Sequence, residues 1–164
     1  MELSPTRAIV PGSFDPITVG HTDVIERASK MFDHVTVAVS KNAEKTSMFT
    51  ADERVAFAEA AVSHLKNVTV VIADGLLSDT MSELGAGTIV KGARGTTDFD
   101  YEYSLFGVMR TFAPGCDTVI LPAKAEYAHV SSTYARELIR YGCSLDRALP
   151  APVIPLVEKA RSKK

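Results

Sequence analysis

The chain has little cysteine, and this shortage excludes two classes of small protein. Cys116 and Cys143 are the two cysteines among 164 residues. They form no CxxC pair and have no histidine at metal-ligand spacing, so neither a disulfide framework nor a zinc site is expected. The simplest interpretation is two free thiols in a reduced, cytoplasmic setting, although a single disulfide stays open.

Long apolar runs and a strong net charge are also missing. No apolar stretch approaches the length that spans a membrane, and the first five residues lack the basic start and apolar core of a secretory signal. The net charge of -2 argues against general binding to nucleic acid, but it permits a local basic pocket. A hydrophobic content of 46% and a charged content of 23% are ordinary for a globular protein, and the length predicts one domain over residues 1–164.

The stretch from Arg7 to Arg27 has the most informative pattern. An apolar run at residues 8–10 leads into a turn, Pro11-Gly12-Ser13-Phe14-Asp15-Pro16, and then into Gly20-His21. Apolar residues follow at helical spacing, namely Val24, Ile25, Ala28, Met31 and Phe32. A strand that passes through a glycine-containing turn into a helix presents backbone N–H groups and the positive end of a helix dipole. This stretch therefore predicts a site for the phosphates of a nucleotide.

The rest of the chain repeats the alternation of strand and helix. β-branched runs at 35–39, 68–72, 88–90 and 119–121 predict four more strands, each followed by a segment with helical spacing. Thr50 and Glu53 have the spacing of a capping box, and Gly85 and Gly142 each end a predicted helix. We therefore expect an α/β fold: a doubly wound, Rossmann-like sheet of five parallel strands with helices on both faces, followed by a helical tail from about residue 150.

Ligands of such folds bind at the carboxyl ends of the strands. The residues that follow the strands are cations, hydroxyls and a histidine at a helix start: Gly12, Ser13 and His21; Lys45; Lys91 and Arg94; and Tyr127, His129, Ser131, Ser132 and Thr133. Each has an ordinary alternative when taken alone. The serines can simply cap a helix, and Glu102 can be an exposed carboxylate or can hold a ribose or Arg94. Asp15 is expected to order the turn rather than to act as an acid or base.

Four longer motifs make the pattern specific: PGSFDPITVGH at 11–21, EKTSMFTADER at 44–54, KGARGTTDFDYE at 91–102 and YAHVSSTYAREL at 127–138. With these motifs the chain resembles the bacterial phosphopantetheine adenylyltransferases over nearly its whole length. The first motif contains the signature of the wider nucleotidylyltransferase superfamily, and the second and third separate this family from its relatives. The resemblance implies transfer of the adenylyl group of ATP to 4′-phosphopantetheine, which yields dephospho-coenzyme A and pyrophosphate in coenzyme A synthesis.

The resemblance also implies roles for individual residues. His21 matches the catalytic histidine that binds ATP and stabilises the transition state, and Ser13 matches a hydroxyl that touches both substrates. The phosphopantetheine-binding positions are Ser13, Lys45, Leu77 and Lys91. The ATP-binding positions are Ser13, Phe14, His21, Gly92, Ala93, Arg94, Glu102, Tyr127, Ala128, His129, Val130, Ser131, Ser132 and Thr133.

Some positions depart from the family pattern. Met109 stands where many members have an asparagine that faces the pantetheine arm. Tyr127 replaces a frequent tryptophan, and Thr133 replaces a frequent third serine. Residues 73–87 match less well, which makes Leu77 the weakest assignment.

The resemblance further implies a homohexamer and feedback inhibition by coenzyme A. Mg²⁺ is expected to arrive with the nucleotide, because the sequence shows no dedicated carboxylate cage and hence no protein metal site. Two other functions stay open. One is transfer to a different small-molecule acceptor, with ATP or CTP as the donor, and the other is a non-catalytic nucleotide-binding module on the same fold.

Overall fold

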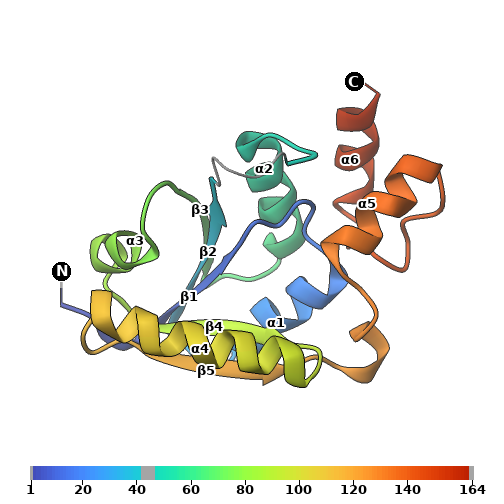
Figure 1. Cartoon of the computed structure of the whole chain (residues 1–164). Helices are drawn as coiled ribbons and strands as arrows, with labels where there is room; N and C mark the ends of the chain where they lie inside the picture. Colours follow the sequence, from blue (N-terminus) through green and yellow to red (C-terminus); the bar gives the residue numbers. More distant parts are fainter. Residues whose placement is uncertain (1, 42–46, 163–164) are drawn as a thin grey trace.

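Five parallel strands form the centre of the computed structural model, which describes residues 2–41 and 47–162 (Figure 1). Their spatial order is β3-β2-β1-β4-β5, and every pair of neighbours is parallel. The strands are β1 (Ser4–Gly12), β2 (His34–Ser40), β3 (Val68–Ala73), β4 (Ala86–Ala93) and β5 (Asp117–Pro122). Each contains the apolar or β-branched run that predicted it, because such residues suit the strands of a covered sheet.

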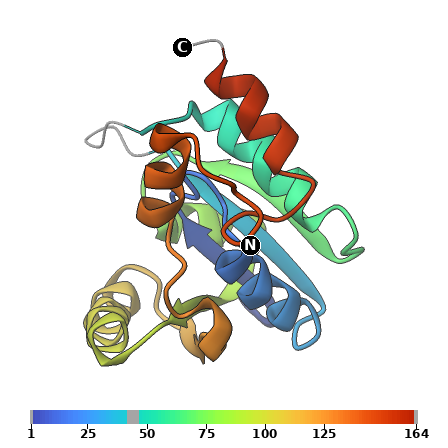
Figure 2. The same ribbon diagram turned by 90° about the vertical axis from the view of Figure 1, so that its right-hand side faces the viewer.

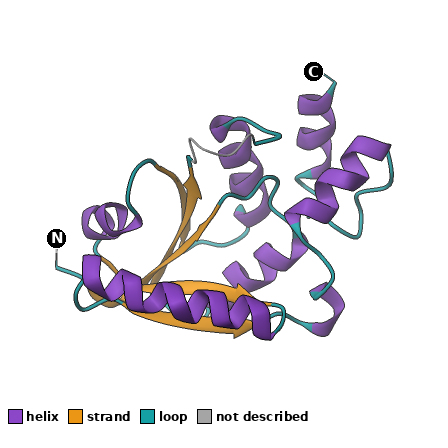
Figure 3. Cartoon of the chain, viewed as in Figure 1, coloured by secondary structure: helices purple, strands orange, loops and turns teal. Residues whose placement is uncertain are grey.

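Helices cover both faces of the sheet, as the alternating pattern predicted (Figure 3). The helices are α1 (Val19–Ser29), α2 (Ala51–Val62), α3 (Leu77–Leu84), α4 (Thr96–Phe112), α5 (Ser132–Tyr141) and α6 (Ile154–Arg161), with a short 3-10 turn at Ala125–Tyr127. Residues of α1, α2, α5 and α6 pack into one core cluster, and residues of α3 and α4 pack into or against the other. The fold is therefore the doubly wound, Rossmann-like α/β arrangement.

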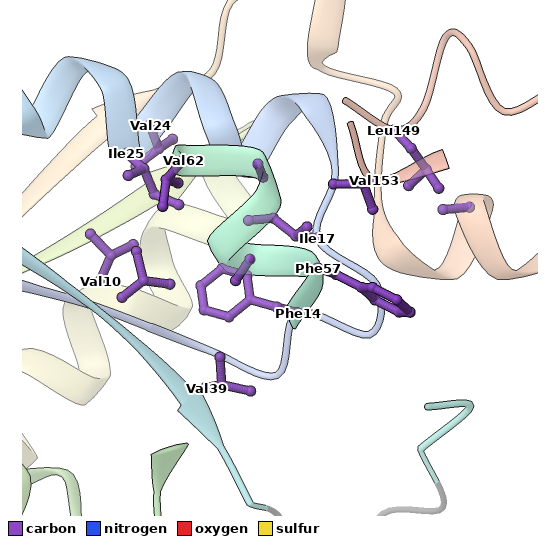
Figure 4. Close-up of a cluster of buried hydrophobic side chains, with 14 of the residues drawn as sticks. Val10, Phe14, Ile17, Val24, Ile25, Val39, Phe57, Val62, Leu149 and Val153 are labelled. Carbon is purple, nitrogen blue, oxygen red and sulfur yellow. The ribbon is translucent and has the colours of Figure 1, made fainter. Parts of the chain in front are cut away.

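The alternation of β1 shows why two cores form. Ala8 and Val10 belong to the larger cluster, whereas Ile9 between them belongs to the smaller one. Successive side chains of a strand point to opposite faces, so one central strand supplies both cores. Figure 4 shows part of the larger cluster, in which Phe14 lies among the buried side chains of the strands and helices.

Local signals explain several helix boundaries. Thr50 and Glu53 form the predicted capping box: the Glu53 N–H donates to Thr50 Oγ1 at 3.2 Å, and the Thr50 N–H donates to Glu53 Oε2 at 2.9 Å. Gly85 and Gly142 end α3 and α5 with φ angles of 63° and 68°, which glycine adopts without strain. The first helix is shorter than its apolar pattern: it ends at Ser29, and the chain turns toward β2 before it reaches Met31, which is exposed.

The strand order places the expected ligand site at the carboxyl ends of the neighbouring strands β1 and β4. The chain runs from β1 outward to β3 and then crosses back to β4 beside β1, so the direction of winding reverses between β1 and β4. Figure 2 views the molecule from the side where α5 and α6 lie.

Cys116 is a buried free thiol and Cys143 an exposed one. Within the described ranges, no helix has the length and apolar character needed to cross a bilayer.

Candidate active site

A cavity of about 310 Å³ opens at the carboxyl ends of β1 and β4. Four segments line it: the turn after β1, the start of α1, the exit of β4 with the first turns of α4, and the loop between β5 and α5. These segments are far apart in sequence, and the winding reversal brings them together. The predicted ligand edge is therefore a real cavity.

His21 is held by the residue that caps its own helix. The backbone N–H of Thr18 donates to His21 Nδ1 at 3.1 Å, and Thr18 Oγ1 lies 3.0 Å from the same nitrogen. A backbone N–H can only donate, so Nδ1 must be the acceptor and carry no proton. The ring proton of the neutral imidazole is therefore on Nε2, which leaves an N–H donor on a ring that lines the cavity.

The same surroundings keep this imidazole uncharged. Burial, and then the positive charge of Arg94, lower the pKa of His21 from 6.5 to about 4. Phe14 packs edge-on against the ring, with the two centroids 5.1 Å apart. His21 is thus a fixed, neutral hydrogen-bond donor at neutral pH, and it is not a general base.

Two basic side chains from the exit of β4 enter the cavity, and each is paired with a carboxylate of α4. Lys91 Nζ lies 3.3 Å from Glu102 Oε2, and Arg94 Nε lies 2.9 Å from Asp98 Oδ2. The hydrogen bond from Arg94 is the largest of the effects that lower the pKa of Asp98. The sequence left open whether Glu102 is an exposed carboxylate or holds a ribose or Arg94. In the structure Glu102 pairs with Lys91 instead.

One glycine of β4 allows helix α1 to pack close to the strand. A Cβ on Gly92 would lie 2.9 Å from Val24 Cγ2, which is closer than real Cβ atoms approach. The absence of a side chain there lets α1 pack directly against the exit of β4. Gly92 is thus needed for packing, and its backbone also lines the cavity.

Hydrogen bonds from the segment before α2 and from α5 fix the turn after β1. The two carboxylate oxygens of buried Asp15 accept the N–H groups of Met48 and Phe49 at 2.8 and 2.9 Å, so Asp15 orders the turn as expected. Arg136 of α5 donates to the Asp15 carbonyl at 2.8 Å. The Ser132 hydroxyl donates to the Pro16 carbonyl at 2.9 Å.

A buried carboxylate of α1 holds the loop that follows β5. Asp23 Oδ1 lies 2.6 Å from Lys124 Nζ, and Asp23 Oδ2 lies 3.2 Å from Arg27 Nη1. Arg27 also donates to the Pro122 carbonyl at 2.8 Å, and Lys124 lies over the ring of Tyr127. These contacts place Tyr127 at the cavity, and Ser131 at its far end caps α5 by accepting the Tyr134 N–H at 3.1 Å.

The structure gathers many, but not all, of the sequence-predicted site residues. Those that line the cavity are Phe14, His21, Lys91, Gly92, Arg94, Glu102, Tyr127, Val130, Ser131 and Ser132. Ser13, Ala93, Ala128, His129 and Thr133 adjoin lining residues but are not part of the lining. Leu77 begins α3, which does not line the cavity, and its side chain packs against the smaller core cluster. Lys45 lies outside the described residues.

Among the residues missed from the sequence are three that hold other site residues in place. Thr18 could have been found from its spacing to His21, which is that of a capping box. Asp98 could have been found from the i,i+4 spacing to Arg94. Arg54 gave no local signal, because the carbonyl groups to which it donates include that of Ser13, 41 residues away.

The fold and the cavity define a class of protein: a nucleotide-handling α/β protein with a fixed histidine donor and basic groups at the switch point. The model of the cytidylyltransferase-like family matches residues 9–138, which contain every segment of this cavity. A solved structure from Vibrio parahaemolyticus, provisionally assigned as a nicotinate-nucleotide adenylyltransferase, has the same fold. Its TM-score is 0.66 at 22% identity, with 97% of this chain and 93% of that chain covered.

Curated relatives narrow the class. A phosphopantetheine adenylyltransferase of Levilactobacillus brevis is 47% identical over 90% of this chain and 92% of its own length. One of Symbiobacterium thermophilum is 44% identical over 88% of this chain and 89% of its own. One of Staphylococcus haemolyticus is 39% identical over 99% and 98%. The chain belongs to the phosphopantetheine adenylyltransferase family, a group of nucleotidyltransferases.

Proposed function

We propose that this protein transfers the adenylyl group of ATP to 4′-phosphopantetheine. An oxygen of the acceptor phosphate attacks the α-phosphorus of ATP, the bond from that phosphorus to the bridging oxygen breaks, and pyrophosphate leaves with dephospho-coenzyme A as the product. The observation that carries the proposal is the meeting of His21, Lys91, Arg94 and the start of α5 around one cavity in a chain of this family.

The nucleophile needs no proton acceptor. A phosphate monoester has a second pKa of about 6, so it is largely a dianion at neutral pH. The energetic difficulty is to bring two anions together and to stabilise the charge that spreads over the α-phosphorus in the transition state. Positioned donors and cations supply this stabilisation.

Each described group has a part in this scheme. Lys91 binds the acceptor phosphate once it exchanges its pair with Glu102. Lys45, which lies outside the described residues, is proposed for the same phosphate because the resemblance assigns it there. Arg94 binds the triphosphate, and the N–H groups at the start of α5 donate to further phosphate oxygens. The Nε2–H of His21 donates to an oxygen that gains charge in the transition state, which requires the neutral tautomer that Thr18 selects.

The cavity is compatible with Mg²⁺ that arrives on the nucleotide. Among residues 2–41 and 47–162, no group of three His, Cys, Asp or Glu side chains could hold a metal. The two carboxylates that line the cavity, Asp98 and Glu102, are already paired with cations. Phosphate oxygens and water would therefore supply the ligands, and the ion would neutralise part of the triphosphate charge.

A pyrophosphate-release assay tests the function. The protein is mixed with ATP or CTP and with a panel of acceptors that includes 4′-phosphopantetheine and nicotinate mononucleotide. We expect release with ATP and phosphopantetheine. Release of pyrophosphate only with nicotinate mononucleotide as the acceptor, or only with CTP as the donor, would identify the protein as a different nucleotidylyltransferase. Binding of the nucleotide without release of pyrophosphate would indicate a non-catalytic module.

The role of His21 is tested by replacing it with alanine. Loss of one donor that acts in the transition state typically lowers kcat about 100-fold or more, and the KM for ATP should change far less. Near-normal turnover of His21→Ala would reject this role.

Self-association into a hexamer is also part of the proposal. Helix α4, all of which the structure describes, has no buried residue, yet Tyr101, Tyr103, Val108 and Phe112 are each more than half exposed. Such a helix is suited to burial against other copies of the chain. Light scattering on the purified protein measures the mass, and a monomer at micromolar concentration would contradict the proposal.

Coenzyme A is proposed as the feedback inhibitor, and the cytoplasm as the location. Coenzyme A contains the pantetheine arm and the adenylyl group, so it should compete with both substrates for the cavity. Initial rates measured against each substrate would show this competition. The free thiols of Cys116 and Cys143 support a reducing location.

A further inference from the structure

One guanidinium reaches three segments beside the cavity. Arg54 is buried in the first turn of α2, where the Thr50–Glu53 capping box fixes the helix start. Its Nη1 donates to the Ser13 carbonyl at 2.6 Å and to the Ser40 carbonyl at 2.9 Å, and its Nε donates to the Phe49 carbonyl at 3.2 Å. Arg54 does not line the cavity, whereas Phe14, which follows Ser13, does. Any effect of Arg54 on the reaction must therefore act through another group.

The bond to Ser13 determines the direction of the next N–H group. In a planar trans peptide, the carbonyl of one residue and the N–H of the next point in opposite directions. Because the Ser13 carbonyl points toward Arg54, the Phe14 N–H points away from α2.

Phe14 has an unfavourable backbone conformation in this arrangement. Its φ angle is 45°, in the left-handed region that side chains other than glycine rarely adopt. Rotation of the Ser13–Phe14 peptide by about half a turn would bring this φ angle into the favoured extended region and would reverse the N–H. The hydrogen bond from Arg54 opposes that rotation.

We propose that Arg54 is a positioning residue that keeps the strained Ser13–Phe14 peptide oriented so that the Phe14 N–H donates to a phosphate oxygen of the nucleotide. This inference deepens the proposed function and rests on it. Arg54 itself touches no substrate. The packing of Phe14 against His21 at 5.1 Å then brings this backbone donor and the imidazole donor to the same part of the cavity.

The first test compares Arg54→Met and Arg54→Lys with Asn67→Ala. Asn67 is a matched control, because its Nδ2 also donates to three carbonyls, those of Ser29, Phe32 and Asp33, at the opposite edge of the sheet. We expect kcat of Arg54→Met to fall about 10- to 100-fold per folded molecule, less than for outright loss of one transition-state donor, because the Phe14 N–H is misdirected and not removed. Arg54→Lys should lose less, and Asn67→Ala should lose stability while its kcat stays within about twofold.

A second measurement needs no substitution. Titration of the wild-type protein with α,β-methylene-ATP should move the NMR signal of the Phe14 amide proton markedly downfield, as a new hydrogen bond to phosphate requires. If kcat of both Arg54 variants stays near wild type, or if the Phe14 amide does not move while the Gly20 and Gly92 amides do, the inference is wrong. Wild-type protein that binds the analogue but releases no pyrophosphate from ATP in the presence of 4′-phosphopantetheine would instead overturn the proposed function.

Discussion

The half-buried, uncharged His21 makes the stability of the fold depend on pH in a definite direction. Its pKa is lowered from 6.5 to about 4, so between these values the unfolded chain binds a proton that the folded chain does not. The contribution of His21 to stability is present above pH 6.5 and is lost as the pH falls toward 4. A shift of this size corresponds to about 3 kcal/mol between pH 7 and pH 4.

Urea unfolding of wild type and His21→Gln at several pH values between 7 and 4 measures this contribution. Other groups affect both proteins equally, so the difference between their unfolding free energies isolates His21. We expect the advantage of the wild type at pH 7 to shrink by about 3 kcal/mol by pH 4. His34→Gln is a suitable control, because burial and Arg7 also lower the pKa of His34, but it lies at the opposite edge of the sheet. Parallel curves for wild type and His21→Gln would refute the reasoning.

Two further substitutions test the proposed acceptor contact and the packing beside the cavity. Lys45→Ala should raise the KM for phosphopantetheine about tenfold and spare ATP affinity, because the charged hydrogen bond proposed for Lys45 would be lost; calorimetry that shows the reverse would contradict this role. Gly92→Ala should lower the free energy of unfolding by about 1–3 kcal/mol, because the new methyl group would lie 2.9 Å from the side chain of Val24, and a melting curve unchanged from wild type would contradict this packing argument.

The regular part of the fold could be predicted because its signals are local. The run from Val35 to Val39 has a composition that suits a strand covered on both faces, and Gly85 supplies the backbone conformation with which α3 ends. The strand order did not follow from these signals. The site could still be located without it, because the carboxyl ends of parallel strands meet at one edge of a sheet. This rule predicted that His21, Lys91 and Arg94 lie together, and all three line the cavity.

The parts of the site that could not be predicted depend on contacts between distant segments. The helical spacing placed Asp98 and Glu102 on one face of α4, but it could not decide which cation each would pair with. The contact of Arg54 with Ser13 could be predicted only by someone who already knew that α2 packs beside the turn after β1. The left-handed backbone of Phe14 was also invisible, because a phenylalanine gives no indication of a positive φ angle.

The carboxylates of α4 have a consequence for how selectively the cavity takes up anions. Glu102 pairs with Lys91 and Asp98 pairs with Arg94, so the positive charges of the cavity are compensated. The cavity therefore attracts a single inorganic anion only weakly. Each substrate must displace one internal competitor: the acceptor phosphate displaces Glu102 from Lys91, and the triphosphate displaces Asp98 from Arg94. The same competition assists departure, because Asp98 can pair again with Arg94 as pyrophosphate leaves.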